Sequence, residues 1–544
     1  MKVVFSRNGV SGIATYTALM PKEFGMRKAL VGLAGITIIL SSLSGVVSAG
    51  SLDKTGTQWV PYLEWSLTNS SYEGNPYDLV ATVTFSHAEN GERITTEMFY
   101  AGGTTWKFRF AGTQAGIWTF TNSSSDSELS GKTGTVTIAP NPGVHGFVKK
   151  FNQKWGWQGT ETAFVPQFVM YRTPTTYYNR PSLIDNDIDT FMNEHGFTGF
   201  HTSIACRWFD INEDTYDNIS VPNPDIRTFD ALELLITKVH AGGGLVHIWA
   251  WGDEQRHQTP VKWGINGAED RRLQRYIAAR LGPLPGWTMG YGFDLDEWVT
   301  VSQLKTWRDY MHSKLGWPHF LGGRPAGPNR GTDHSAYVNW NEPLDYSSYE
   351  HHQPDYDVYV AALQTVPGQP AFSEDRFRMR GSGYPDKDYD MEMTRRGLWH
   401  SAMAGGVANI WGYLHNSPGD GASGPYPNPE WIKTNALFFE KRFLPDMCRD
   451  NSITDGICLR DSDRSSYVFY KEDTTSIRMN LSAMNGAQPA VAVDTRKSYV
   501  EITLGALSAT DRIWSAPYSS DWAVAVGVFG GPAAPSDQRT ETTK

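Results

Sequence analysis

The chain has 544 residues, of which 19% are charged and 13% are aromatic, with 20 tryptophans and a formal net charge of −10 at pH 7. This length predicts two or three folded domains, and a negative net charge without a basic patch argues against a nucleic-acid partner. Many Trp, Tyr and His residues with modest charge are typical of proteins that stack aromatic rings on neutral ligands such as sugars.

The first predicted element is a secretory signal at residues 26–49. Arg27 and Lys28 precede an apolar run that ends in small residues, so the signal begins at Met26. An uncleaved membrane anchor is the alternative, because the apolar run approaches the length that spans a bilayer. Its Ser and Gly content favours cleavage. We therefore expect residues 1–49 to be an extension and signal peptide, and the protein to be secreted or periplasmic, with no other membrane segment.

Residues 50–142 predict an antiparallel β-sandwich. The segments "DLVATVTFSH" and "GKTGTVTIAP" alternate apolar and polar residues and are rich in Val and Thr. The segment "TTWKFRFAGTQAGIWTFTN" contains two such runs separated by a turn with glycine. Short strands at regular spacing are typical of sandwiches. The Pro- and Gly-rich segment "APNPGVHG", 139–146, indicates the end of this domain.

Residues 143–447 predict a (β/α)₈ TIM barrel, because strand-like runs alternate with amphipathic helical segments. A doubly wound open sheet is the alternative, but no Gly-rich phosphate loop follows the first strand. The eight strand candidates are "TAFVPQFVMY", "GFTGFHTSIA", "GGLVHIWAWG", "WTMGYGFDL", "HFLGGRP", "SAYVNWN", "QPAFSED" and "VANIWGYL".

Residues 448–530 are again rich in strand-like runs and predict a small C-terminal β-sandwich, and 531–544 predict a disordered tail. Cys206, Cys448 and Cys458 have no zinc-site spacing. Cys448 and Cys458 could close a short disulfide loop, or all three could be reduced thiols, and the sequence leaves both open.

The segment "GYGFDLDEW", residues 290–298, crowds three carboxylates against aromatic rings. By strand count it ends the fourth strand, and Glu374 in "QPAFSEDRFRMR" ends the seventh. Catalytic groups of such barrels lie at the C-terminal ends of the strands. Two carboxyl groups facing each other there suit glycoside hydrolysis, which needs one proton donor and one ionised carboxylate.

We assign the proton donor to Glu297, since Trp298 beside it provides a desolvating wall, and the ionised carboxylate to Glu374, since Arg376 and Arg378 are close in sequence. Two rival assignments are weighed. Asp294 and Asp296 could replace Glu297 or bind substrate. Glu342 in "NWNEP" could be the acid, although the strand count places it after the sixth strand.

Further residues near predicted strand ends are candidates for substrate binding. Arg207 could hold Glu374 ionised or recognise an acidic sugar, and the tryptophans could instead fill the core. No third ligand completes a metal site around the His pair, so we expect no metal and no cofactor. The candidates are Asp294, Asp296, Arg207, Trp208, Trp249, Trp251, Trp298, Tyr349, His351, His352, Arg376 and Trp411.

Three segments resemble the clan A (β/α)₈-barrel glycoside hydrolases, and more closely their apiosidase-like, cellulase-related members. "RYIAARLGPLPGWTMGYGFDLDEW" resembles the segment that carries the acid/base, "QPAFSEDRFR" the nucleophile strand, and "RRGLWHSAMAGGVANIWGY", 395–413, the last helix and strand. The resemblance covers most of residues 55–510. It implies a retaining mechanism, an aromatic platform at Trp411, an immunoglobulin-like N-terminal domain and a C-terminal β domain. One departure is Asp296, where the clan has an Asn that contacts the sugar 2-hydroxyl.

The sequence therefore predicts a secreted, retaining glycoside hydrolase that cleaves O-glycosidic bonds of a plant, algal or microbial polysaccharide or oligosaccharide. A non-catalytic carbohydrate-binding or surface protein on a barrel scaffold is the alternative. A lyase would need a Tyr, His or Lys base with charge-neutralising groups, which the sequence does not assemble. The expected partner is a carbohydrate, and the oligomeric state stays open.

Overall fold

The computed structural model describes residues 52–213, 222–252, 260–325, 337–377, 389–412 and 426–529, with the backbone alone at Arg376 and Phe377. The predicted signal and C-terminal tail lie outside these residues and stay predictions. Within the described ranges, no helix is both long enough and apolar enough to cross a bilayer.

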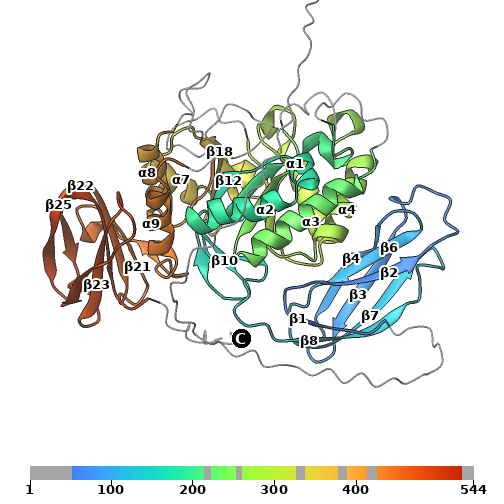
Figure 1. Cartoon of the computed structure of the whole chain (residues 1–544), viewed down its shortest axis with the longest axis horizontal. Helices are drawn as coiled ribbons and strands as arrows, with labels where there is room; N and C mark the ends of the chain where they lie inside the picture. The colour runs from blue at the N-terminus through green and yellow to red at the C-terminus, as the bar shows by residue number, and fades with distance from the viewer. Residues whose placement is uncertain are drawn as a thin grey trace, which may run out of the picture. The chain divides into compact units, whose positions relative to one another are not determined.

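The N-terminal region contains two β-sheets (Figure 1). In β3, the alternating Val and Phe side chains are buried and the threonines between them are partly exposed, as a strand with one face on a core requires. The five-stranded sheet has the order β1-β8-β7-β3-β4 and the other has the order β2-β6-β5. The strands are β1 Lys54–Thr57, β2 Leu63–Thr68, β3 Ala81–His87, β4 Arg93–Glu97, β5 Phe99–Tyr100, β6 Thr105–Phe110, β7 Gly116–Ser124 and β8 Thr133–Ala139.

A three-stranded antiparallel sheet precedes the barrel, with β9 Val148–Phe151, β10 Lys154–Trp157 and β11 Ala163–Phe164. The Trp155 ring is fully buried against Phe320, Tyr346 and Phe372 of the barrel. Its indole Nε1 donates to the backbone oxygen of Ala371, the first residue of β18, at 3.2 Å. This sheet therefore packs against the N-terminal end of the barrel.

Eight parallel strands form the central sheet, which confirms the predicted barrel fold. The order is β16-β15-β14-β13-β12-β19-β18-β17. The strands are β12 Gln167–Met170, β13 Gly199–Ser203, β14 Leu245–Trp249, β15 Trp287–Gly290, β16 Leu321–Gly322, β17 Ser347–Tyr349, β18 Ala371–Phe377 and β19 Ala408–Trp411.

Helices lie between these strands in the sequence (Figure 1). The predicted helices that follow the second, third and fourth strands are present as α3, α4 and α5. The α-helices are α1 Pro174–Asn179, α2 Ser182–Asp187, α3 Ile226–Ala241, α4 Ala268–Leu281, α5 Val301–Lys314, α6 Val338–Asn341, α7 Tyr356–Thr365, α8 Met391–Met403 and α9 Pro429–Phe439, and a π-helix follows α2 over Ile188–Glu194.

The predicted sixth strand is wrong. The segment "SAYVNWN" was expected to be extended, but its described residues form the short helix α6, and the sixth strand is β17 at Ser347–Tyr349. The sequence hides β17 because two of its three residues are serine. Both serines can be buried because their hydroxyl groups are hydrogen-bonded. Ser347 Oγ donates to Gln369, and Ser348 Oγ donates to Glu374.

The C-terminal strands form one six-stranded antiparallel sheet. The long strands β22 and β25 pair with register shifts that bend the sheet. The three cysteines, all within the described residues, form no disulfide, and Cys448 is exposed. The strands, in the order β20-β21-β22-β25-β23-β24, are β20 Cys448–Arg449, β21 Ile457–Arg460, β22 Tyr467–Asn480, β23 Gln488–Asp494, β24 Ile502–Leu507 and β25 Asp511–Val526.

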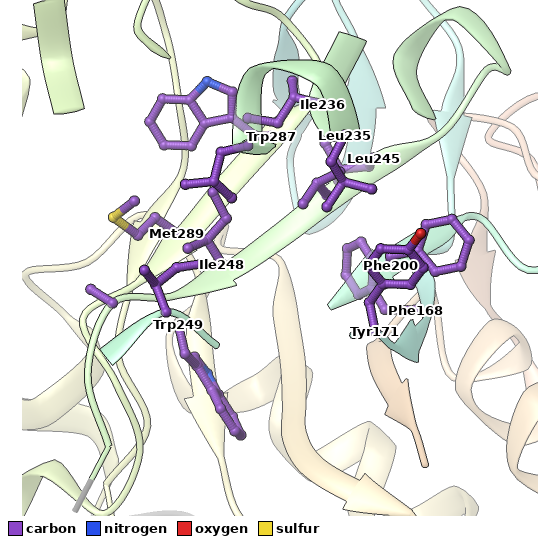
Figure 2. Close-up of a cluster of buried hydrophobic side chains, with 14 of the residues drawn as sticks. Phe168, Tyr171, Phe200, Leu235, Ile236, Leu245, Ile248, Trp249, Trp287 and Met289 are labelled. Atoms are coloured by element: carbon purple, nitrogen blue, oxygen red, sulfur yellow. The ribbon is translucent and has the colours of Figure 1, made fainter. Parts of the chain in front are cut away.

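Side chains of the barrel strands alternate between the helices and the barrel interior. In Figure 2 the Trp249 ring points away from Leu235 and Ile236 of α3. His247, two residues earlier on β14, contacts Phe168 and Phe372 of two other barrel strands. His247 and Trp249 therefore face the interior, where β18 places Glu374.

Candidate active site

Glu374 is the fourth of the seven residues of β18, where the register with β19 shifts between Ser373 and Arg376, and its carboxyl group lies beside Gly290, the last residue of β15. This β-bulge bends the strand beside the barrel interior. The Glu374 side chain is fully buried. A buried carboxylate is stable only when it is hydrogen-bonded or paired, so its partners define the site.

Four side chains surround the Glu374 carboxyl group. Two come from β14, and two come from β17 or the residue just ahead of it. Oε1 lies 3.2 Å from Trp249 Nε1, 2.9 Å from the Tyr346 hydroxyl and 2.9 Å from His247 Nε2. Oε2 accepts a hydrogen bond from Ser348 Oγ. An ionised carboxyl group accepts about four hydrogen bonds, so this set matches the anion. Burial, and then the charge of Glu374, raise the pKa of Tyr346 far above its usual value, so Tyr346 stays a donor.

Two glycines leave the space that this arrangement needs. A Cβ atom on Gly290, the last residue of β15, would lie 2.9 Å from Glu374 Oε1 and 3.0 Å from the Trp249 ring. A Cβ atom on Gly322 in β16 would lie 2.2 Å from the Tyr346 ring. Any larger residue at either position would displace a partner of Glu374 or the carboxyl group itself.

The predicted acidic cluster follows β15 and divides into an ion-paired and an exposed part. Asp294 has a left-handed backbone (φ 52°), which Asp tolerates better than most residues, and its carboxylate lies 2.6 Å from Arg324 Nη2. Asp296 and Glu297 are exposed on a short 3₁₀-helix, Leu295–Glu297. Trp298 is partly buried and packs with its ring 6.0 Å from that of Tyr291.

Arg324, which was not among the predicted site residues, follows β16 and pairs with carboxylates that follow two other strands, β15 and β17. Its guanidinium also bonds Glu350 after β17. Burial alone would lower the pKa of Arg324, but the charges of Glu350, Asp294 and Asp375 more than offset this and raise it. Arg324 therefore carries a permanent positive charge among these acids.

Glu350, His352 and Asp375 form a buried group beside Arg324. Each offers one ligand atom, and these atoms lie within 4.8 Å of one another, close enough to share a metal ion. His352 Nε2 lies 3.0 Å from Glu350 Oε1 and 3.9 Å from Asp375 Oδ2. The Arg324 guanidinium bonds Glu350 and so supplies a positive charge to this group.

Three further predicted residues lie at strand ends: Tyr349 ends β17, His351 follows it, and Trp411 ends β19. Tyr349 is buried, and this burial raises the pKa of its hydroxyl. His351 Nδ1 lies 3.2 Å from the backbone nitrogen of Gln353. Trp411 donates from Nε1 to Gln167 Oε1 at 2.8 Å, and its ring approaches Gly397 of α8, so it packs β19 against that helix.

The candidates after β13 and β14 divide between the interior and the surrounding core. Trp249 bonds Glu374 as described above. Trp251 is buried and its ring stacks on Phe209 with 6.0 Å between ring centres. Trp208 is fully buried and donates to the backbone oxygen of Ala250. Arg207 Nε lies 3.3 Å from Thr175 Oγ1.

The expectation that Arg207 holds Glu374 ionised is therefore corrected. The side-chain partner of Arg207 is Thr175, and the neighbours of Glu374 are the neutral donors and His247. The side chain of Arg376, and Arg378 entirely, lie outside the described residues. Glu342 is exposed after α6, and its backbone oxygen faces Gln369 just ahead of β18. It lies at the opposite end of the sheet from Glu374.

Comparisons with known proteins support the fold. Residues 56–125 match a family model described as a domain of unknown function, DUF5060. No curated protein sequence matches the chain.

A candidate glycoside hydrolase from Bacteroides vulgatus ATCC 8482 is 16% identical, with a TM-score of 0.67 over 87% of this chain and 99% of that one. A structure described as a glycoside hydrolase is 12% identical, with a TM-score of 0.52 over 70% and 96% of the two chains. A glycoside hydrolase family 5 structure from the same Bacteroides strain is 14% identical, with a TM-score of 0.51 over 70% and 93%. The chain, which has β-sheets on both sides of its barrel in the sequence, therefore shares a fold with proteins described as glycoside hydrolases.

Proposed function

We propose that this protein is an exported glycoside hydrolase that cleaves O-glycosidic bonds by a retaining, double-displacement mechanism. Glu374 is the nucleophile and Glu297 the proton donor. The observation that carries the proposal is Glu374 itself, a buried carboxyl group inside the barrel that lies beside the last residues of β14 and β15 and has hydrogen-bond donors on both oxygens. Catalytic groups of this barrel fold lie at these strand ends.

The hydrogen bonds distinguish the two oxygens of Glu374. Three groups approach Oε1, whereas the donor at Oε2 is Ser348. We assign the attack on the anomeric carbon to Oε2, because Oε1 is saturated by its donors. When the glycosyl ester is hydrolysed, the same donors stabilise the negative charge that returns to the carboxylate.

Asp294 and Glu297, two of the three acids after β15, differ in their suitability as proton donor. Asp294 is paired with the permanently charged Arg324, which favours its ionised form. Glu297 lies in the same loop with its side chain exposed, so it can approach the leaving group of a bound substrate. We therefore assign the proton to Glu297, and to Asp294 a role in fixing the loop through Arg324.

The proposed substrate is a plant, algal or microbial polysaccharide or oligosaccharide. The fold shared with proteins described as glycoside hydrolases supports the carbohydrate class. The aromatic side chains of the loop after β15, Phe293 and Trp298, are partly exposed and suited to contact sugar rings. Export rests on the apolar segment that follows Arg27 and Lys28.

The proposal is tested by comparing two glutamine variants on a panel of polysaccharides and aryl glycosides. Glu374→Gln removes the nucleophile and should lower kcat by at least about 1,000-fold, with the circular dichroism spectrum unchanged. Glu342→Gln is the matched control, because it changes an exposed glutamate at the opposite end of the sheet. Full activity in Glu374→Gln would overturn the assignment.

A carbohydrate-binding protein without catalysis is the second candidate, and the complete burial of Glu374 is the observation that favours it. A nucleophile must reach the anomeric carbon, so the barrel mouth must open around Glu374 when substrate binds. Calorimetric binding of an oligosaccharide by the wild-type protein, with no product released over a day, would select this candidate instead.

A further inference from the structure

The interior of the barrel holds two histidines behind Glu374 that the proposed mechanism does not yet use. His201 on β13 and His247 on β14 are paired in register and are both buried. Their Nδ1 atoms lie 2.8 Å apart, and His247 Nε2 lies 2.9 Å from Glu374 Oε1 and 3.2 Å from the Tyr346 hydroxyl. The three side chains therefore form a continuous path from β13 through β14 to β18.

We propose that His201 and His247 are positioning residues for the nucleophile. His201 donates its Nδ1–H to Nδ1 of His247, and this fixes His247 as the tautomer protonated at Nε2, which donates to the Tyr346 hydroxyl and lies 2.9 Å from Glu374 Oε1. The proposal deepens the proposed function and rests on its assignment of Glu374 as nucleophile.

Proton counting leads to this arrangement. The single proton of the Tyr346 hydroxyl goes to Glu374 Oε1, so the Tyr346 oxygen is the acceptor in its 3.2 Å hydrogen bond with His247 Nε2, and that nitrogen must carry a proton. A neutral imidazole has one N–H, so Nδ1 of that His247 tautomer is an acceptor. The 2.8 Å contact between the two Nδ1 atoms then needs the proton on His201.

Packing fixes the orientation of both rings, so neither can turn to exchange its nitrogens. The His247 ring meets the Phe372 ring edge-on at 4.7 Å, and the Phe168 ring lies at 5.8 Å. The His201 ring meets the Trp249 ring edge-on at 4.3 Å. Trp249 is itself a donor to Glu374, so His201 supports the carboxyl group through two of its neighbours.

The consequence is a fixed role for each oxygen of Glu374. Trp249 and Tyr346 donate to Oε1 and His247 Nε2 lies 2.9 Å from it, so the carboxyl group cannot rotate to exchange its oxygens without losing two hydrogen bonds and the histidine contact. Oε2 is then held in one position for attack. Disturbing the pair should lower kcat and leave KM unchanged, because neither histidine is assigned a contact with substrate.

Two isosteric substitutions at each position give a crossed test. Asparagine places an amide near Nδ1 of histidine, and glutamine places one near Nε2. We expect His201→Asn to keep most of kcat while His201→Gln loses about 10- to 100-fold, because the buried Nδ1 acceptor of His247 is then left without a donor. At His247 the order reverses, with His247→Gln more active than His247→Asn.

A steric role for the two rings predicts a different order. Glutamine is closer to histidine in volume than asparagine, so it would be the better substitute at both positions. That result, or equal activity in all four variants, would overturn the inference. If Glu374→Gln were also fully active, the proposed function would fail with it, whereas an inactive Glu374→Gln would confine the failure to the histidine pair.

A spectroscopic measurement tests the tautomers without turnover. In the full chain with ¹⁵N-labelled histidine, long-range ¹H–¹⁵N correlations should show His247 protonated at Nε2 and His201 protonated at Nδ1, with assignments taken from the signals lost in His247→Gln and His201→Asn. A His247 ring protonated at Nδ1 alone would contradict the proposed arrangement.

Discussion

At the scale of single residues, the site depends on which carboxyl groups are paired and which are exposed. Glu374 is enclosed by neutral donors and His247, Asp294 is paired with Arg324, and Glu297 is exposed. One loop after β15 thus presents two acids in different environments. Such differences are how barrels of this kind separate a proton donor from groups that stay ionised.

This difference predicts separate effects for the two acids. Glu297→Gln should lower kcat/KM by about 100-fold or more on polysaccharide but much less on an aryl glycoside whose leaving group needs no proton. Asp294→Asn should show no such dependence on the leaving group, because its loss acts through Arg324. The measurement is kcat/KM on a series of leaving groups, and the opposite pattern would assign the proton to Asp294.

The residue scale also shows what the sequence could predict. Glu374 was identified because it follows an apolar run at the expected strand position. The sequence did not identify His201, His247 and Tyr346. Each lies inside or just ahead of a strand, where the sequence pattern suggests a core residue. Their role comes from contacts between strands far apart in the sequence, 125 residues in the case of Trp249 and Glu374, and no local pattern reports those.

At the scale of elements, strands with alternating or continuous apolar residues were predicted well, and the polar ones were not. The strand candidates at the second, third and fourth positions contain β13, β14 and β15. The sixth strand was misplaced because Ser347 and Ser348 are buried by hydrogen bonds to Gln369 and Glu374, which hydrophobic periodicity cannot register.

Helix α3 carries a buried histidine that should make the fold sensitive to acid. Burial lowers the pKa of His240 from 6.5 to about 4, although a contact with the backbone oxygen of Gly146 opposes this. The unfolded chain takes up a proton near pH 6.5 and the folded chain does so only near pH 4. Stability is therefore complete above pH 6.5 and falls by about 3 kcal/mol as the pH drops from 6.5 to 4.

Urea unfolding at several pH values checks this expectation, with His240→Gln as the comparison. The variant cannot titrate at position 240, so its free energy of unfolding should fall by about 3 kcal/mol less than that of the wild type over the same pH range. Parallel curves for the two proteins would show that His240 does not contribute to acid sensitivity.

At the scale of the whole molecule, ion pairs connect the N-terminal strands to the barrel helices. Arg109 on β6 is buried, lies 2.8 Å from Glu233 of α3 and donates to the backbone oxygen of Arg280 at 2.8 Å. Glu97 on β4 pairs with Arg275 of α4 at 2.9 Å and with Lys314 of α5 at 2.8 Å. These contacts indicate that the N-terminal region and the barrel unfold together.

Breaking the pair between Arg109 and Glu233 should uncouple the unfolding of the N-terminal region from that of the barrel. Arg109→Met leaves Glu233 with Arg280 but removes a buried charge from the network, and should lower the free energy of unfolding by about 3–5 kcal/mol. Lys107→Met is the control, since its pair with Glu64 is partly exposed and contributes about 1 kcal/mol or less. Calorimetry should show one transition for wild type and an earlier, separate transition for Arg109→Met. A single unshifted transition in that variant would contradict the coupling.

The measurement that tests the central claim most directly is the identity of the residue that carries the sugar during turnover. The protein would be incubated with a 2-deoxy-2-fluoro glycoside of the sugar that the substrate panel selects, digested, and analysed by mass spectrometry. A retaining mechanism with Glu374 as nucleophile predicts one glycosylated peptide with the mass added at Glu374. A label on another carboxyl group, or an active enzyme that forms no covalent adduct and releases product of inverted configuration, would contradict it.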